Sequence, residues 1–101
     1  MIDKLNSAEL RAFFNAILTL ETEEECGNFF EDICTIKEIQ DISQRLEVAK
    51  QLKDGKVYTE IAASTGASTA TISRVNKCLS YGSGGYRTVL ERLEKKNGGK
   101  A

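Results

Sequence analysis

One segment of this 101-residue sequence combines small, hydroxyl-bearing and cationic side chains at helical spacing. It covers residues 58–77 and reads YTEIAASTGASTATISRVNK. A helix that begins with small polar residues and continues with cations can enter a nucleic-acid groove closely and contact phosphates or base edges. The residues that would make those contacts follow the glycine of this segment: Ser68, Thr69, Ala70, Thr71, Ser73, Arg74 and Lys77.

A helix-turn-helix would place these residues on one exposed surface. Ala62 is small where the two helices would cross, and Gly66 can adopt the left-handed backbone that a short turn needs. Ser68 would cap the second helix. The alternative is an ordinary pair of packed helices, but the absence of acids from residue 67 to residue 90 favours a nucleic-acid interface. The positions expected to face inward are apolar: Ile61, Ile72 and Val75.

The charge distribution divides the chain into halves of opposite sign, although the net charge is only −1. Residues 1–49 carry four basic and eleven acidic residues, a formal charge of −7, whereas residues 50–101 carry ten basic and four acidic ones, a formal charge of +6. A basic half that contains the segment at 58–77 is typical of a polyanion-binding protein. Lys53 and Lys56 become further phosphate-contacting candidates. Two solvated surfaces that differ in charge by chance are the alternative.

The composition argues against several other function classes. The chain has no His, which removes the commonest general base and the commonest transition-metal ligand, so we expect neither an enzyme nor a metal or cofactor site. Cys26, Cys34 and Cys78 lack the spacing of a zinc or redox motif, and we interpret them as small core residues in a reducing cytosol. No signal peptide or membrane-spanning segment is evident, so a cytoplasmic protein is expected.

Apolar residues recur at helical spacing, so the sequence predicts an all-α fold of six helices. We expect one domain over residues 1–96: dimerisation helices within 1–34, a long central helix at 35–57, the helix-turn-helix at 58–79 and a last helix at 86–96. Residues 82–85 are a glycine-rich connector without the spacing of a phosphate-binding loop, and residues 97–101 are a flexible tail. The first three helices have N-terminal capping signals: Asn6 with Glu9, Thr22 with Glu25, and Thr35 with Glu38.

The first two of these helices contain four of the seven aromatic residues, yet little other chain is available to cover them. Their large apolar stripes can be explained simply as the core of one chain. They can also be explained by a partner subunit, which would bury side chains that a small domain leaves open. We therefore expect an intertwined homodimer.

Residues 35–93 resemble the Trp repressor superfamily, most closely in the stretch GASTATISR at 66–74. The segment SYGSGGY at 80–86 is similar to the YerC/YecD branch of Trp repressor-related proteins. The resemblance implies an intertwined dimer whose fourth and fifth helices read double-stranded operator DNA. It thus implies a sequence-specific transcriptional regulator, a repressor by the family's example. The alternative is a helical protein–protein interaction module that retains the fold without binding DNA.

The resemblance also implies a candidate effector pocket. Arg45 and Arg74 align with the two arginines that hold the corepressor indole in the Trp repressor, and Thr35 aligns with a residue that lines the pocket. Val75 stands where the repressor has glycine, and Cys78 where it has serine. Because valine would occupy the space of a planar ring and a thiol is a poor hydrogen-bond partner, tryptophan is not the expected ligand. Another small-molecule effector stays possible. The arginines have alternative roles: ion pairs with Glu38, Asp41 or Glu47, or phosphate contact by Arg74.

Overall fold

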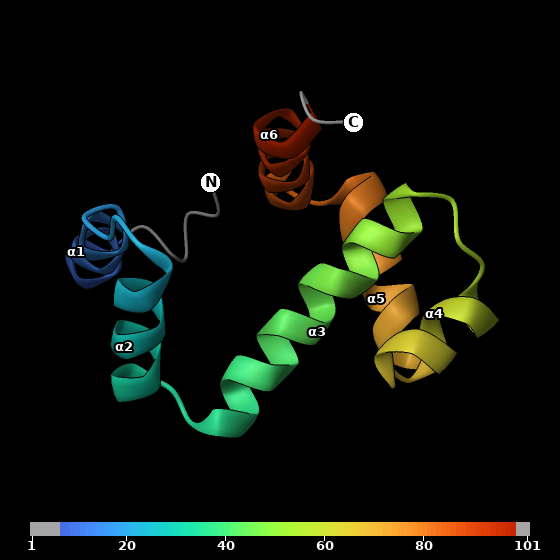
Figure 1. Cartoon of the computed structure of the whole chain (residues 1–101), viewed down its shortest axis with the longest axis horizontal. Helices are drawn as coiled ribbons and strands as arrows, with labels where there is room; N and C mark the ends of the chain where they lie inside the picture. Colours follow the sequence, from blue (N-terminus) through green and yellow to red (C-terminus); the bar gives the residue numbers. More distant parts are fainter. Residues whose placement is uncertain (1–6, 99–101) are drawn as a thin grey trace. The chain divides into compact units, whose positions relative to one another are not determined.

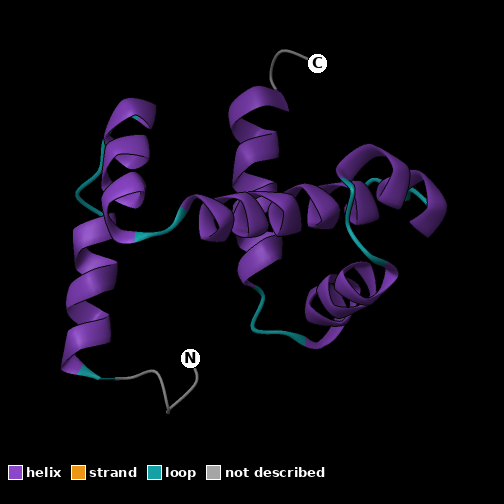
Figure 2. Cartoon of the chain, turned by 90° about the horizontal axis from the view of Figure 1, so that it is seen from below, coloured by secondary structure: helices purple, strands orange, loops and turns teal. Residues whose placement is uncertain are grey.

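The computed structural model describes residues 7–98, and within them it contains six helices and no strand (Figure 2). The all-α prediction is confirmed. The chain divides into two compact units, Met1–Ile39 and Gln40–Ala101. The single domain expected over residues 1–96 stays a prediction. The helices are α1 (Ala8–Ile17), α2 (Glu23–Ile33), α3 (Ile36–Lys53), α4 (Tyr58–Thr65), α5 (Thr69–Tyr81) and α6 (Gly85–Gly98).

Three helix ends, the start of α1 and the ends of α3 and α6, differ from the predicted ones by a few residues. Ser7 caps α1, because its hydroxyl accepts a hydrogen bond from the backbone N–H of Leu10 at 3.1 Å. The cap predicted at Asn6 is therefore wrong, and Asn6 itself lies outside the described residues. Helix α3 ends at Lys53 rather than near residue 57, and α6 continues to Gly98, into the predicted tail. Residues 99–101 are outside the described range.

The starts of α2 and α3 follow the predicted capping signals to different degrees. Thr22 accepts a hydrogen bond from the N–H of Glu25 at 3.1 Å, but the Glu25 carboxylate accepts from the N–H of Glu21 at 2.8 Å, so only half of the predicted capping box forms. At α3 the box is complete, with Thr35 N–H to Glu38 at 2.8 Å and Glu38 N–H to the Thr35 hydroxyl at 3.1 Å. The bond from the Thr35 backbone, followed by that to its side chain, holds the pKa of Glu38 below its usual value.

The first unit is held by aromatic contacts between α1 and α2. The rings of Phe13 and Phe29 have centroids 6.2 Å apart, and each also contacts the phenylalanine beside it in sequence. No described residue of α1 or α2 is fully buried, and Leu18, after the end of α1, is 79% exposed. Removing large apolar side chains from water is the main stabilising contribution to folding. This unit therefore leaves much of its apolar surface without cover.

The second unit contains the buried core. Helix α5 crosses the C-terminal half of α3, and α4 and α6 precede and follow it along the chain (Figure 1). Every helix of this unit and the turn between α4 and α5 contribute to the core, which includes residues of the segment predicted to bind nucleic acid. Its buried residues are Val48, Ala49, Ile61, Ala67, Ile72, Val75 and Leu90.

The cysteines are not core residues, contrary to the sequence-based interpretation. Cys26 and Cys78 are exposed and Cys34 is half-buried, and all three are free thiols. Cys78 lies on α5 between the buried positions Ile72 and Val75 and the half-buried Leu79, on a side of the helix that the core does not reach. Composition alone favours burial of cysteine, but the helical register decides which side it occupies.

Candidate nucleic-acid interface

The turn between α4 and α5 has the predicted helix-turn-helix geometry. Gly66 ends α4 with φ at +75°, and its N–H donates to the carbonyl of Ala62 at 2.9 Å. This left-handed conformation strains residues that carry a Cβ, so a glycine suits the position. Ile61 and Ile72 are completely buried and Val75 is 2% exposed, which confirms the predicted inward positions. The side chains on the opposite side of α5 are consequently directed to solvent.

At the start of α5, some hydroxyl groups form hydrogen bonds within the protein and others are exposed to solvent. Ser68 accepts a hydrogen bond from the N–H of Thr71 at 3.1 Å and donates one to the Thr71 hydroxyl, also at 3.1 Å. Ser68 of the predicted set therefore caps the helix, and the Thr71 hydroxyl is hydrogen-bonded to this cap. Thr69, Ala70 and Ser73 are exposed and form the part of the set that is free to approach a base edge.

Replacing Ser68 by alanine is expected to lower the free energy of unfolding by about 1 kcal/mol, because the N–H of Thr71 loses its capping acceptor. Chemical denaturation followed by circular dichroism measures this change. Ser73→Ala is the matched control, since Ser73 is exposed in the interior of α5 and has no capping role. Equal unfolding free energies for the two variants would contradict the capping role of Ser68.

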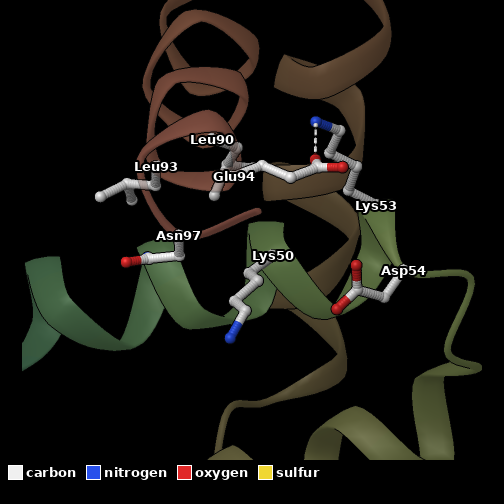
Figure 3. Close-up of a pocket in the computed structure, with 7 residues that line it drawn as sticks. All are labelled: Lys50, Lys53, Asp54, Leu90, Leu93, Glu94 and Asn97. Carbon is white, nitrogen blue, oxygen red and sulfur yellow. Dashed lines mark hydrogen bonds and ion pairs between the residues drawn. The ribbon is translucent and has the colours of Figure 1, made fainter. Parts of the chain in front are cut away.

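The predicted cations do not form one uniform set. Arg74 and Lys77 are exposed on α5, and Lys56 is exposed in the segment that precedes α4. The ammonium of Lys53, by contrast, lies 3.3 Å from a carboxylate oxygen of Glu94 on α6, as Figure 3 shows. An exposed ion pair of this kind contributes little stability, so Lys53 is available to another partner only when that contact breaks. Phosphate contact by any of these four cations stays a prediction.

Comparison with known proteins agrees with this geometry. The model of the Trp repressor protein family matches residues 8–94, which is most of the chain. The chain belongs to the Trp repressor family. The uncharacterised protein YerC of Bacillus subtilis (strain 168) is 54% identical over 94 residues, covering 93% of this chain and 90% of YerC.

Two solved structures of Trp repressor relatives share this fold. A TrpR-like protein from Eubacterium eligens superposes with a TM-score of 0.89 at 53% identity, covering 91% of this chain and 95% of the other. A candidate Trp repressor from Staphylococcus aureus gives a TM-score of 0.88 at 53% identity, covering 92% and 93% of the two chains. The fold of this Trp repressor family member is therefore shared over nearly its whole length.

The candidate effector residues of this Trp repressor family member have different environments. Val75 is buried in the core, and Thr35 forms the capping box of α3. Arg74 is exposed on α5, as described above. Arg45 and Cys78 both act electrostatically on Tyr86 of α6. Partial burial raises the pKa of Tyr86, the charge of Arg45 opposes the rise, and Cys78 adds to it.

The alternative role of the two arginines, in salt bridges to Glu38, Asp41 or Glu47, stays a prediction. Arg74 is left exposed to solvent on the side of α5 that carries Lys77. An effector pocket around these residues stays a prediction.

Gln44 and Gln51, which sequence reasoning missed, connect α3 to the helix-turn-helix. Gln44 donates to the carbonyl of Thr65 at 3.1 Å, and Gln51 accepts from the hydroxyl of Ser64 at 2.8 Å. Their separation of seven residues places both on the same side of α3, which was the available sequence signal. Their partners could not be deduced from that signal because the contacts join segments distant in sequence.

Two further features bear on the class of function. Among the described residues, no group of three or more His, Cys, Asp or Glu side chains is placed to hold a metal ion. None of the helices in that part of the chain combines the length and apolar character needed to cross a membrane. The Trp repressor family is a regulatory DNA-binding family rather than an enzymatic one.

Proposed function

We propose that this protein is a sequence-specific, DNA-binding transcriptional regulator that acts as a homodimer through α4 and α5. The observation that carries the proposal is the exposed side of α5. There, small side chains precede Arg74 and Lys77, and no acid occurs from residue 67 to residue 90. A buried core beneath α5 holds this surface in one orientation. By the family's example the regulator is a repressor and works in the cytoplasm.

The two parts of α5 would have different tasks at DNA. Thr69, Ala70 and Ser73 are exposed near the start of the helix and are short enough to let its backbone enter a major groove, where methyl and hydroxyl groups meet base edges. Arg74 and Lys77 lie further along, where cations contact phosphates and hold the protein in register. Affinity and sequence preference would therefore depend on different residues.

Exposed apolar side chains support the homodimer. Phe14, Ile33 and Ile36 in the first unit are between 37% and 73% exposed, and Val89 and Leu93 of α6 are 46% and 42% exposed. A second copy would remove such side chains from water. Two copies of α5 related by a two-fold axis would enter successive major grooves about 34 Å apart.

A groove on the second unit is a suitable place for part of this interface. It has a volume of about 470 Å³ and is formed by the end of α3 and by α6 (Figure 3). Leu90 and Leu93 provide its apolar surface and Lys50 adds a cation. Because residues 1–49 carry a formal charge of −7 and residues 50–101 one of +6, attraction between the acidic half of one copy and the basic half of another favours association.

Binding to DNA is expected to weaken steeply as salt increases. If Lys56, Arg74 and Lys77 of two subunits each replace a counterion, about six phosphates are neutralised and the double-logarithmic slope of affinity against salt is about −5. Filter binding measures this slope, first with a random-sequence duplex and then with duplexes selected from that pool. An absence of DNA retention even at low salt would contradict the proposed function.

One observation favours a second candidate function, a helical protein-interaction module. The first unit is acidic, which favours a basic partner. It also exposes Phe14, Leu18 and Ile33, which such a partner would cover. This candidate predicts that the cations of α5 are dispensable in cells. The charge-reversal experiment at the start of the Discussion distinguishes the two functions.

A further inference from the structure

We propose that Gln44 is a positioning residue for DNA recognition, which holds the turn of the helix-turn-helix against α3 and thereby sets the orientation of α5. The inference rests on the proposed function, because it concerns how the same surface is presented to DNA. Gln44 belongs to neither α4 nor α5, and the exposed set on α5 does not include it.

The first step is the contact between Gln44 and Thr65. The side-chain amide of Gln44 donates to the carbonyl of Thr65 at 3.1 Å in a partly buried site, across 21 positions of sequence. Thr65 is the last residue of α4, and the carbonyls of a final helical turn lack partners within their own helix. Leaving a partly buried carbonyl unpaired is costly, so this bond favours one position of the turn on α3.

The second step leads from Thr65 to the start of α5. The Thr65 hydroxyl donates to the carbonyl of Ile61 at 2.7 Å and accepts from the N–H of Ala67 at 3.1 Å. Ala67 is 5% exposed and directly precedes Ser68, the N-cap of α5. Gln44 of α3 thus holds the backbone carbonyl of Thr65, and the Thr65 hydroxyl holds the N–H of Ala67, two residues before α5 begins.

The third step compares Gln44 with the second glutamine. Gln51 accepts from the hydroxyl of Ser64 at 2.8 Å and donates to Glu47 at 2.9 Å, but both of these hydrogen bonds are exposed. If Gly66 carried a Cβ, that atom would lie 4.0 Å from the amide nitrogen of Gln44, so the Gln44 side chain packs against the turn. Water replaces an exposed hydrogen bond more readily than a partly buried one, which makes Gln44 the stronger constraint.

Loss of this constraint should affect specific and non-specific DNA binding differently. Base contacts require α5 to enter the groove in one orientation, whereas contacts of flexible cations with phosphates tolerate a small rotation. A change at Gln44 should therefore lower the preference for a selected sequence while the affinity for a scrambled duplex and the salt slope stay the same. A residue that only stabilised the fold would lower both affinities together.

The test compares Gln44→Met with Gln40→Met in the full-length chain. Gln40 is exposed one turn earlier on α3, so the second variant controls for the change of side chain. Affinities are measured for a duplex selected from a random pool and for its scrambled version. Gln44→Met should reduce the ratio of the two affinities about 3- to 10-fold, the equivalent of one hydrogen bond, with an unchanged salt slope. Amide hydrogen exchange at Gly66 and Ala67 should accelerate in Gln44→Met alone.

The outcomes separate the inference from the function on which it rests. If the unchanged protein binds the selected duplex and Gln44→Met has the same affinity ratio as Gln40→Met, the positioning role is overturned while the proposed function stands. If the unchanged protein retains no duplex at low salt, the proposed function is overturned and the inference fails with it. Should Gln44→Met not fold, Gln44→Lys, which keeps an N–H donor, is compared with Gln40→Lys. A preserved ratio supports the inference, and a reduced one overturns it.

Discussion

Replacing both Arg74 and Lys77 by glutamate is expected to reduce DNA affinity by at least about 100-fold at about 0.1 M salt. Each subunit would lose two phosphate contacts and acquire two repulsive charges, and a dimer would suffer both changes twice. Both side chains are exposed, so the substitutions should leave the core and the unfolding temperature almost unchanged. Filter binding and thermal unfolding of the same preparations measure the two effects.

The matched control is Lys95→Glu with Lys96→Glu, which makes the same change of net charge in the last turn of α6. If recognition is through α5, the control should lose much less affinity than the Arg74 and Lys77 variant. Equal losses would mean that DNA responds only to overall charge. Survival of the cellular function after the reversal on α5 would instead favour the protein-interaction module.

Truncating Ile72 to alanine is expected to lower the free energy of unfolding by about 2–5 kcal/mol. Ile72 is completely buried in the core of the second unit, so the substitution removes apolar contacts and leaves a cavity among the other core side chains. For a domain of about 100 residues, such a loss is a large fraction of the total stability. Denaturant unfolding followed by circular dichroism measures it.

Val57→Ala is the exposed control for this truncation, because Val57 is 58% exposed before α4. It should change the free energy of unfolding by no more than about 0.5 kcal/mol. Similar effects of the two substitutions would contradict the assignment of Ile72 to the core. Weakening of DNA binding by Ile72→Ala should follow the loss of folded protein and disappear at a lower temperature, where the variant is folded.

The helix-turn-helix was predictable because its signals are local. The αL glycine, the capping serine and the apolar positions at helical spacing act within a few residues of one another, so sequence pattern and structure agree at Gly66, Ser68 and Ile72. The capping box of Thr35 and Glu38 formed for the same reason. The family resemblance rested on this same local stretch.

Predictions failed where the outcome depends on which side of a helix faces the rest of the chain. Cys78 was expected in the core, but the register that buries Val75 leaves the thiol exposed. Lys53, a candidate phosphate contact, lies with its ammonium 3.3 Å from Glu94 of α6, and its role at phosphate stays a prediction. Both environments depend on how the helices pack, which the local sequence pattern does not show.

By itself, the sequence determined the helical class, the helix-turn-helix and the acid-free surface of α5, because periodicity, capping and charge act over short stretches of chain. Only the tertiary structure decided which of those residues are available. It paired Lys53 with Glu94 and brought Gln44 to the carbonyl of Thr65. The physical reason is that a polar group's partner depends on how helices cross, and the packing of the buried core sets those crossings.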